Sequence, residues 1–586
     1  MRLVVRDATS GKWRLFERPL EVVVARRLED VRPALARVEV ECARHDRFAA
    51  GFLSYEAAPA FDAALTTQPH DRFPLLCFGL YGSVHDCALE DLPYIQKKGS
   101  DPFFDEKRGL TLFSPSVSAE RYQDVFRQLQ ELIRNGDTYQ VNFTYRLRTR
   151  LSSDPFALFL QLAAAHRPPF GAYVDIDDWA LCSASPELFF HRTGETIESK
   201  PMKGTASRGL WFEQDIEHAR RLRESDKERA ENVMIVDMVR NDLGRIARPG
   251  TVRATNLFDV ERYPTLLQLT SRVTAETSAS LTETMAALFP AASITGAPKA
   301  RTMEIISDLE CSPRRIYTGS IGFVEPGGRA QFNVAIRTLL FDKATGDAEY
   351  GVGGGIVADS SCDEEWEESR IKAGVLTTLP PSFDLLETML WKPDTGYVLL
   401  ARHMKRLRQS AEYFGYELDV VDAGRRLELF ASELSGPQRV RMLVSRLGAV
   451  NLTATPQDID EGFPALALAD SPIDSANPFL YHKTTNRQVY EDAVKARPGF
   501  SDVLLFNERN EVTESTIANL VIEIGGELMT PPVACGLLPG TLRAQLLEDR
   551  KASERAVTVV QLREAGACYL FNSVRGFHRV SVVTDL

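Results

Sequence analysis

Two adjacent prolines, Pro380 and Pro381, interrupt this chain in the run VLTTLPPSFDLLET at residues 375–388. A charged, helix-like run (DEEWEESRIKAGVL) ends just before them, and a strand-like run begins just after them. Proline fixes φ and carries no amide proton, so a Pro-Pro pair ends a helix and stiffens a linker. Because a single core rarely extends over a chain of 586 residues, we predict a domain boundary near Leu379.

This boundary gives a first domain of residues 1–376, a linker at 377–383 and a second domain of residues 384–586. Within the first domain, we place an N-terminal part at about 1–105 and a motif-bearing part at about 110–376. Length alone favours two or three domains, because large α/β layers exceed the usual domain size.

Hydrophobic periodicity predicts an α/β (α+β) fold class, with a large mixed α/β sheet domain followed by a smaller α+β domain. Before the prolines we expect strands at 145–151, 179–185, 321–326, 330–341 and 348–358, and helices from Phe212 to Ile246 and from Asp363 to Val375. After them we expect a strand that turns into a helix over 397–416, then strand-rich runs at 439–447, 501–516, 519–532 and 567–576.

Charge and cysteine usage exclude several classes of protein. The 69 basic and 81 acidic residues give a net charge of −12, which argues against nucleic-acid or anionic-membrane partners. The eight cysteines form no C-x-x-C pair, so a reduced, cytoplasmic protein is expected. The N-terminus MRLVVRDATSGKW lacks the apolar run of a signal peptide, and no stretch is apolar enough to span a membrane.

Two predicted helices of the first domain carry carboxylates on one face. Glu228 and Glu231 are three residues apart, and Glu365, Glu368 and Lys372 also share a face. Carboxylates from two helices could hold Mg²⁺, a hard cation that takes oxygen ligands and keeps some of its waters. The spacing alone favours two solvated helix faces.

Three short motifs contain glycine. SITGAPKAR (293–301) and GVGGGIVA (351–358) expose backbone amides to which an anion could come close, although each run is also compatible with a tight turn. Neither has the spacing of a nucleotide-binding loop. In PMKGT (201–205), Lys203 could act as a nucleophile if it is partly buried beside a carboxylate. As an isolated lysine it could equally be a surface charge.

Taken together and in this order, the motifs closely resemble the chorismate-utilising enzymes over residues 110–375. The motifs are SASPELFF, SKPMKGT, RAENVMIVDMVRNDLGRI, FPAASITGAPK, YTGSIGF, AIRT and GGGIVADS. The resemblance implies that Glu231 and Glu368 bind Mg²⁺, and that Glu187 is the general acid/base that protonates the departing C4 hydroxyl of chorismate. It implies six substrate-binding positions, which are Thr205, Thr295, Tyr317, Arg337, Gly353 and Gly355.

Lys203 separates the subfamilies of these enzymes. Anthranilate synthases resemble this sequence but carry alanine here, whereas aminodeoxychorismate synthases carry a lysine that attacks C2 before ammonia attacks C4. Isochorismate and salicylate synthases also keep a lysine. Gln268 stands where many members have histidine, and glutamine cannot shuttle protons at neutral pH. This departure puts pyruvate elimination in the same site in doubt.

The second domain contains a set of residues that suits pyridoxal 5'-phosphate (PLP). PLP needs a lysine, an acid at its pyridine nitrogen and a phosphate cup, and HMKRL, YHKTTNRQ, NEVTESTIANL, LLPGTLR and FNSVRG together resemble the fold-type IV PLP enzymes over about 383–580. The resemblance implies that Lys483 is the PLP lysine, Glu514 the acid, and Arg406 a phosphate ligand. Backbone amides of Thr541 and Leu542 complete the cup. Arg575 is a candidate for binding a substrate carboxylate.

The two resemblances together imply a bifunctional enzyme of 4-aminobenzoate formation in the folate pathway. Its first domain would aminate chorismate with ammonia from solution or from a separate glutamine amidotransferase subunit, because none of the cysteines lies in a G-x-C-x-G elbow. Its second domain would eliminate pyruvate as a lyase, and a homodimer through this domain is expected. The alternatives are an isochorismate- or salicylate-type enzyme fused to an aminotransferase, and a chorismate enzyme with a non-catalytic PLP-like scaffold.

Overall fold

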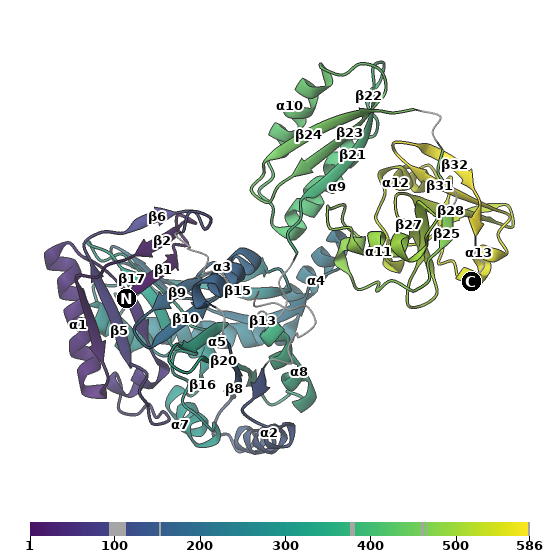
Figure 1. The fold of residues 1–586 in the computed structure, drawn as a ribbon. Coiled ribbons are helices and arrows are strands. Elements are labelled where there is room, and N and C mark those ends of the chain that lie inside the picture. The colour runs from purple at the N-terminus through teal and green to yellow at the C-terminus, as the bar shows by residue number, and fades with distance from the viewer. Residues whose placement is uncertain (93–112, 152–153, 375–380, 459–461, 465, 584–586) are drawn as a thin grey trace. The chain divides into compact units, whose positions relative to one another are not determined.

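The computed structural model describes residues 1–92, 113–151, 154–374, 381–458, 462–464 and 466–583 (Figure 1). It forms two compact units. Unit 1 comprises Met1–Ala206 and Arg221–Pro380, and unit 2 comprises Ser207–Arg220 and Pro381–Leu586. The predicted boundary at Leu379 and the division at 105–110 lie outside the described residues. Our domain limits therefore stay predictions. They place residues 207–220 in the first domain, whereas in the structure these residues belong to unit 2.

Unit 1 contains two large sheets. The first has the order β16 (Gly296–Ala297), β8 (Gln140–Arg150), β20 (Asp347–Ile356), β19 (Thr338–Asp342), β10 (Trp179–Ser183), β9 (Ala172–Asp175), β1 (Arg2–Arg6), β2 (Trp13–Phe16) and β6 (His85–Cys87), with β7 (Ser114–Pro115) beside β8. The second has the order β13 (Met202–Ser207), β15 (Leu266–Glu276), β12 (Thr196–Lys200), β11 (Leu188–Thr193), β18 (Ala330–Asn333), β17 (Ser320–Val324), β4 (Phe48–Leu53), β5 (Leu76–Tyr81) and β3 (Glu21–Ala25), with β14 (Arg253–Arg262) beside β15. From β8 to β2 the first sheet is antiparallel throughout.

The two sheets pack face to face, and helices cover their outer faces. One core is shared by both sheets, with Phe16 from the first and Phe52 and Phe323 from the second. The helices of unit 1 are α1 (Leu28–His45), α2 (Ala119–Arg134), α3 (Pro155–His166), α5 (Asp226–Gly244), α6 (Leu281–Leu288), α7 (Lys299–Leu309) and α8 (Cys362–Ala373), with short 3-10 turns at Tyr55–Ala60 and Ala292–Ile294. Apolar residues of α1, α5 and α6 pack on the second sheet, and those of α2 and α3 pack on the first.

Unit 2 contains two further sheets. A four-stranded sheet has the order β22 (Gly396–Tyr397), β21 (Leu385–Lys392), β23 (Gln438–Val444) and β24 (Val450–Pro456). A nine-stranded sheet has the order β30 (Ser553–Glu554), β29 (Glu527–Thr530), β28 (Asn519–Ile524), β27 (Val512–Ser515), β26 (Asp502–Phe506), β25 (Leu466–Leu468) and β33 (Val582–Val583), with β31 (Ala567–Asn572) paired to β28 and β32 (Gly576–Val580) paired to β31. The helices are α9 (Leu400–Phe414), α10 (Val420–Ala431), α11 (Gln488–Ala496), α12 (Thr541–Glu548) and α13 (Val559–Arg563), with 3-10 turns at Pro478–Leu480 and Val533–Cys535.

The predicted fold class is confirmed, and two predicted elements are corrected. The helix expected over 212–246 is two helices, α4 (Phe212–Glu224) and α5, because Ser225 is extended and its hydroxyl caps α5. The strand expected over 330–341 is β18 and β19, which belong to different sheets. Arg337 lies at this crossing with φ +50°, so the crossing itself carries a predicted site residue. No helix in the described ranges is long and apolar enough to cross a bilayer.

A buried ion cluster joins α7 to β8. Glu310, just after α7, accepts hydrogen bonds from the amide and hydroxyl of Thr144 and from the guanidinium of Arg314 at 2.6 Å. Arg146 approaches the same carboxylate at 3.5 Å. All three charged side chains are almost completely buried. A buried cluster of this kind stabilises the fold only as long as every member keeps its partners.

We expect Glu310→Ala to lower the free energy of unfolding of unit 1 by about 3–5 kcal/mol, because it leaves two arginines buried without their carboxylate. The measurement is urea denaturation followed by circular dichroism. The matched control is Glu367→Ala, which removes an exposed ion pair with Arg370 and should cost less than about 1 kcal/mol. Equal losses in the two variants would contradict the importance of the buried cluster.

Candidate active sites

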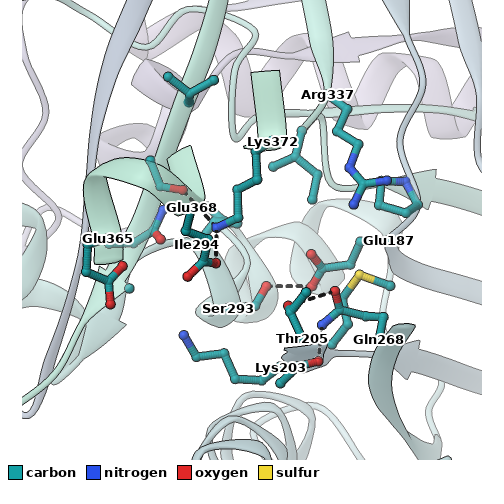
Figure 2. Close-up of a pocket in the computed structure, with 18 of the residues that line it drawn as sticks. Glu187, Lys203, Thr205, Gln268, Ser293, Ile294, Arg337, Glu365, Glu368 and Lys372 are labelled. Carbon is teal, nitrogen blue, oxygen red and sulfur yellow. Dashed lines mark hydrogen bonds and ion pairs between the residues drawn. The ribbon is translucent and has the colours of Figure 1, made fainter. Parts of the chain in front are cut away.

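A pocket of about 220 Å³ in unit 1 contains most of the residues predicted for chorismate. It is lined by β8, β20 and α8 on one side and by β13, β15 and α5 on the other, so both sheets contribute to it. Figure 2 shows Lys203, Glu187, Arg337 and Glu368 pointing into this pocket. The predicted residues that line it are Glu187, Lys203, Thr205, Glu231, Tyr317, Arg337, Gly353, Gly355 and Glu368. The roles that we gave them stay predictions.

Thr295 is the predicted residue that does not line this pocket. Its side chain is completely buried, and its hydroxyl faces the carbonyls of Ala291 and Ala292. The preceding residues, Ser293 and Ile294, line the pocket in its place. The SITGAPK motif therefore faces the site through its first two residues, because the chain turns inward at Thr295.

Glu187 is a buried carboxyl group that accepts a hydrogen bond from the Ser293 hydroxyl at 2.6 Å. Only 3% of its surface is exposed. Burial raises the pKa of Glu187 to about 7, although the bond from Ser293 and the charge of Lys203 oppose this shift. A carboxyl group that still holds its proton near neutral pH is suited to act as a general acid.

Four carboxylates face the pocket in two pairs, Glu228 with Glu231 on α5 and Glu365 with Glu368 on α8. Burial and the neighbouring Glu231 raise the pKa of Glu228, whereas Lys372 lowers the pKa of Glu368. Lys203 Nζ lies 3.4 Å from Glu231, and Lys372 Nζ lies 2.8 Å from Glu368. Sequence reasoning gave Lys372 no role in the pocket, although its spacing from Glu368 was visible.

The carboxylates suit Mg²⁺, the metal that the resemblance to chorismate-utilising enzymes implies. The side chains offer oxygen donors only, which is the chemistry that Mg²⁺ prefers, and each pair of like charges would gain from a cation. In the described part of the chain, no three acidic, His or Cys groups form a ready-made cluster. A cation that keeps its waters and shares the substrate's oxygens fits this loose arrangement.

The glycines of GVGGGIVA lie inside β20, so the tight turn considered above is excluded. A Cβ at Gly351 would overlap the Tyr317 ring, and one at Gly355 would come within 2.6 Å of Lys203 Nζ. The absence of side chains here therefore makes room for Tyr317 and Lys203.

Gln268, which stands where many chorismate-utilising enzymes have histidine, holds strand β13, which carries Lys203. Its amide donates to the Gly204 carbonyl at 2.8 Å, and its oxygen accepts from the Thr205 hydroxyl at 3.3 Å. Both of its polar groups are therefore engaged in positioning, and neither is a proton shuttle.

Arg337 is a half-buried cation on the pocket wall. Desolvation lowers its pKa, and its guanidinium lies 5.7 Å from the centre of the Tyr263 ring. Among the described residues no carboxylate forms an ion pair with it. A guanidinium that lines a pocket without an acidic partner is a natural position for a substrate carboxylate.

A second pocket, of about 270 Å³, lies in unit 2 and is lined by all six residues predicted for PLP and its substrate. These are Arg406, Lys483, Glu514, Thr541, Leu542 and Arg575. Burial, followed by the charge of Arg406, lowers the pKa of Lys483 to about 8. A lysine that loses its proton near neutral pH is suited to nucleophilic chemistry.

Glu514 suits the pyridine end of PLP. Burial raises its pKa to about 7, and its carboxylate accepts from the Tyr490 hydroxyl at 2.9 Å, the Asn519 amide at 3.0 Å and the Leu538 backbone at 3.1 Å. A protonated ring nitrogen would supply a positive charge that stabilises the Glu514 carboxylate, the form that burial alone disfavours. The residues present therefore fit the cofactor at this end.

Arg406 and the start of α12 line the same pocket and suit a phosphate group. No side chain caps α12, whose N-cap is Gly540, so the amides at Thr541 and Leu542 are open to an anion. Glu387 holds Arg406 through two hydrogen bonds of 2.9 and 2.7 Å. Burial opposes its ionisation, but Arg406 and His403 lower the pKa of Glu387 to about 2. Sequence reasoning missed Glu387, which has no motif of its own.

Comparison with known proteins supports both resemblances. Residues 6–378 match the family model of the chorismate binding enzymes, and residues 384–583 match that of class IV amino-transferases. Aminodeoxychorismate synthase component 1 of Klebsiella aerogenes is 43% identical over 256 residues, which cover 43% of this chain and 56% of the relative. The chain thus spans about half the length of such curated relatives.

Two further relatives cover more of the first unit. Anthranilate synthase component 1 1 of Haloarcula marismortui is 37% identical over 372 residues, which cover 60% of this chain and 73% of the relative. The crystal structure of anthranilate synthase component I from Streptococcus pneumoniae TIGR4 has 23% identity and a TM-score of 0.54, and the match covers 64% of this chain and 92% of that one. This last likeness concerns the fold. The chain belongs to the chorismate binding enzyme family and carries a class IV amino-transferase domain behind its chorismate-binding domain.

Proposed function

We propose that this chain makes 4-aminobenzoate in two steps. The first pocket aminates chorismate to 4-amino-4-deoxychorismate, and the second eliminates pyruvate from that intermediate. The observation that carries the proposal is Lys203, a lysine where anthranilate synthases carry alanine, in one pocket with the neutral-range acid Glu187. The similarity to aminodeoxychorismate synthase component 1 of Klebsiella aerogenes supports the same choice.

In the first step, Lys203 is the nucleophile and Glu187 the acid. The Lys203 amine attacks C2 of the ring while the C4 hydroxyl departs, and Glu187 gives that hydroxyl its proton because hydroxide is a poor leaving group. Ammonia then attacks C4 and displaces the lysine from C2. Two successive displacements place the amine at C4, the para position of the final product.

The remaining residues of this pocket bind and orient the substrate. The guanidinium of Arg337 and the hydroxyl of Tyr317 hold a carboxylate, and the backbone at Gly353 and Gly355 lets it approach β20 closely. Glu231 and Glu368 would hold Mg²⁺, which supplies positive charge to a substrate carboxylate when it is bound. Gln268 keeps the Lys203 loop in place and takes no proton, so the first site stops at the aminated intermediate.

In the second step, Lys483 takes the proton from C4 of the intermediate. Its low pKa leaves a useful fraction of the amine uncharged near neutral pH. Glu514 would hold the proton at the ring nitrogen of PLP, and Arg406 with the start of α12 would hold its phosphate. PLP, when bound there, supplies an electron sink for the carbanion. Loss of pyruvate then makes the ring aromatic.

Ammonia comes from a separate glutamine amidotransferase. The eight cysteines are free, and none lies in the elbow that such a glutaminase requires. Free thiols also support a reducing compartment, which we take to be the cytoplasm. We retain a homodimer through unit 2 as part of the proposal.

The function is tested by incubating the chain with chorismate, Mg²⁺ and ammonium, with and without PLP, and identifying the products by mass spectrometry. We expect aminodeoxychorismate without PLP and 4-aminobenzoate with it. Isochorismate or salicylate without incorporated nitrogen would support the alternative and overturn the first step. A new amino acid formed from an added 2-oxo acid would instead identify the second site as an aminotransferase.

Lys203→Ala should abolish amination or redirect it, because the ring then lacks its first nucleophile. The matched control is Lys200→Ala, which removes a nearby lysine paired with Glu261 and should keep most of the amination. The measurement is the rate of aminodeoxychorismate formation at saturating ammonium. Normal formation of the para product by Lys203→Ala would refute the covalent step.

Lys483→Ala should let aminodeoxychorismate accumulate while its formation continues at the normal rate, since only the second step loses its base. Lys495→Ala, which changes an exposed lysine of α11, serves as the control. Chromatography of both compounds over time is the measurement. Release of 4-aminobenzoate at the normal rate by Lys483→Ala would show that the second domain is not the lyase.

Amination should slow as the pH rises through about 7, because Glu187 then loses the proton that it must donate. Glu187→Gln should lower the rate by about 10²–10⁴-fold and remove this alkaline limb. Ser293→Ala should move the limb to higher pH, because it removes a hydrogen bond that stabilises the carboxylate. The measurement is the rate of amination from pH 5.5 to 9, and an unchanged limb in Ser293→Ala would assign it to another group.

A further inference from the structure

Unit 2 includes a segment that lies, along the sequence, within the predicted first domain. Residues 207–220 belong to it together with Pro381–Leu586. The segment begins at the last residue of β13, the strand that carries Lys203. Neither family match assigns it a role in the second domain, whose model begins at residue 384.

Inside unit 2 the segment is fixed by a buried ion pair. Arg208 donates to both oxygens of Asp215, at 2.7 and 3.1 Å, and the Gly209 amide donates to the same carboxylate at 3.0 Å. Both charged side chains are more than nine-tenths buried. A Cβ at Gly209 would overlap the backbone at Asp215, so the turn requires glycine.

This turn contacts Tyr413 of α9 at its backbone carbonyl, its ring and its hydroxyl. Arg208 donates to the Tyr413 carbonyl at 2.8 Å and lies 4.3 Å from the centre of its ring, and the Tyr413 hydroxyl donates to the Gly209 carbonyl at 2.7 Å. The Tyr413 ring stacks in turn on His482, with centroids 4.2 Å apart. His482 directly precedes Lys483, so the contacts lead from Asp215 to the PLP lysine.

A second line of contacts reaches the same site. Trp211 lies 5.3 Å from Tyr481, centre to centre, and with Leu210 it packs on the apolar cluster that contains Tyr490. Tyr490 is the residue whose hydroxyl donates to Glu514. The segment therefore completes the packing behind both the lysine and the acid of the second pocket.

We infer that Arg208, Trp211 and Asp215 are positioning residues of the PLP site, and that residues 207–220 are an integral part of the second domain. The inference rests on the proposed PLP chemistry of unit 2. The segment keeps Tyr413 and His482 packed against the chain at Lys483. This packing shields Lys483 from water and fixes its position. The Lys483 backbone carbonyl is held from the other side by the Leu386 amide at 2.9 Å.

The test uses capture of PLP by the full-length apo-protein, which requires an uncharged Lys483. Charged and titratable groups near Lys483 are Arg406, Glu387, Arg487, Glu514 and His403, and Arg439 and Arg441 line the same pocket. None of them is changed. Asp215→Asn keeps the shape of the side chain but removes the charge that holds Arg208. We expect PLP affinity to fall about tenfold or more. We also expect the pH midpoint of capture to rise by about one unit, because a wetter site moves the lysine pKa toward its ordinary value.

Tyr413→Phe is the conservative second variant, since it removes only the hydroxyl bonded to Gly209, and it should shift affinity and midpoint in the same direction by a smaller amount. Two matched controls lie in the same unit. Asp422→Asn changes an exposed aspartate paired with arginines, and Tyr397→Phe removes a hydroxyl bonded to the Leu427 carbonyl. Both controls should capture PLP as the wild type does. Absorbance spectroscopy over pH 6–10 measures affinity and midpoint together.

The outcomes separate this inference from the proposed function. If the wild-type chain captures PLP and both Asp215→Asn and Tyr413→Phe match its affinity and midpoint, the positioning role is wrong. If the variants lose only thermal stability and keep the midpoint, the segment is structural and the inference is equally overturned. If Asp215→Asn does not fold, Tyr413→Phe decides. Failure of the wild type to capture PLP would instead overturn the proposed function, and this inference with it.

Discussion

The buried carboxylate of Glu310 is the interaction on which the first pocket depends. It neutralises Arg314 and Arg146 in a part of the core where neither could remain without a partner. Arg314 then donates to the backbone carbonyls of two pocket residues, and Arg146 lies over the ring of a third. These three residues are Asn142, Ile294 and Tyr317. A charge network outside the pocket thus fixes the pocket wall, although its three charged residues do not themselves line the pocket.

Burial shifts the pKa values of ionisable groups in both pockets through the same physical effect. The pKa values of Glu187 and Glu514 rise to about 7, and that of Lys483 falls to about 8, with burial as the largest cause in each case. Desolvation disfavours whichever form carries charge, so acids keep their protons longer and lysines lose theirs sooner. Two unrelated folds therefore bring their reactive groups into the neutral range by one physical effect. Neighbouring charges adjust the result by smaller amounts.

The sequence predicted the site best where a residue belongs to a contiguous motif. Lys203 and Glu187 were assigned through motifs in family order, since their spacing alone left ordinary surface roles open. Ser293, Glu387 and Tyr490 were missed as partners, because each meets its site residue through tertiary packing. Glu387 pairs with Arg406 across two elements, and no periodicity encodes that meeting. Local rules failed in a similar way at the run 330–341, where a continuous β pattern conceals a change of sheet at Arg337.

The segment 207–220 extends this argument from residues to domains. The Pro-Pro pair indicates where one sequence pattern ends, but a folding unit is defined by which residues bury one another. Arg208 and Trp211 find their partners at Tyr413 and Tyr481, more than two hundred residues further along the chain. A cut at the prolines would separate these partners, although it would break no element of secondary structure in the described chain. The sequence pattern and the buried contacts therefore give different domain boundaries. The buried contacts are the ones that define the folding unit.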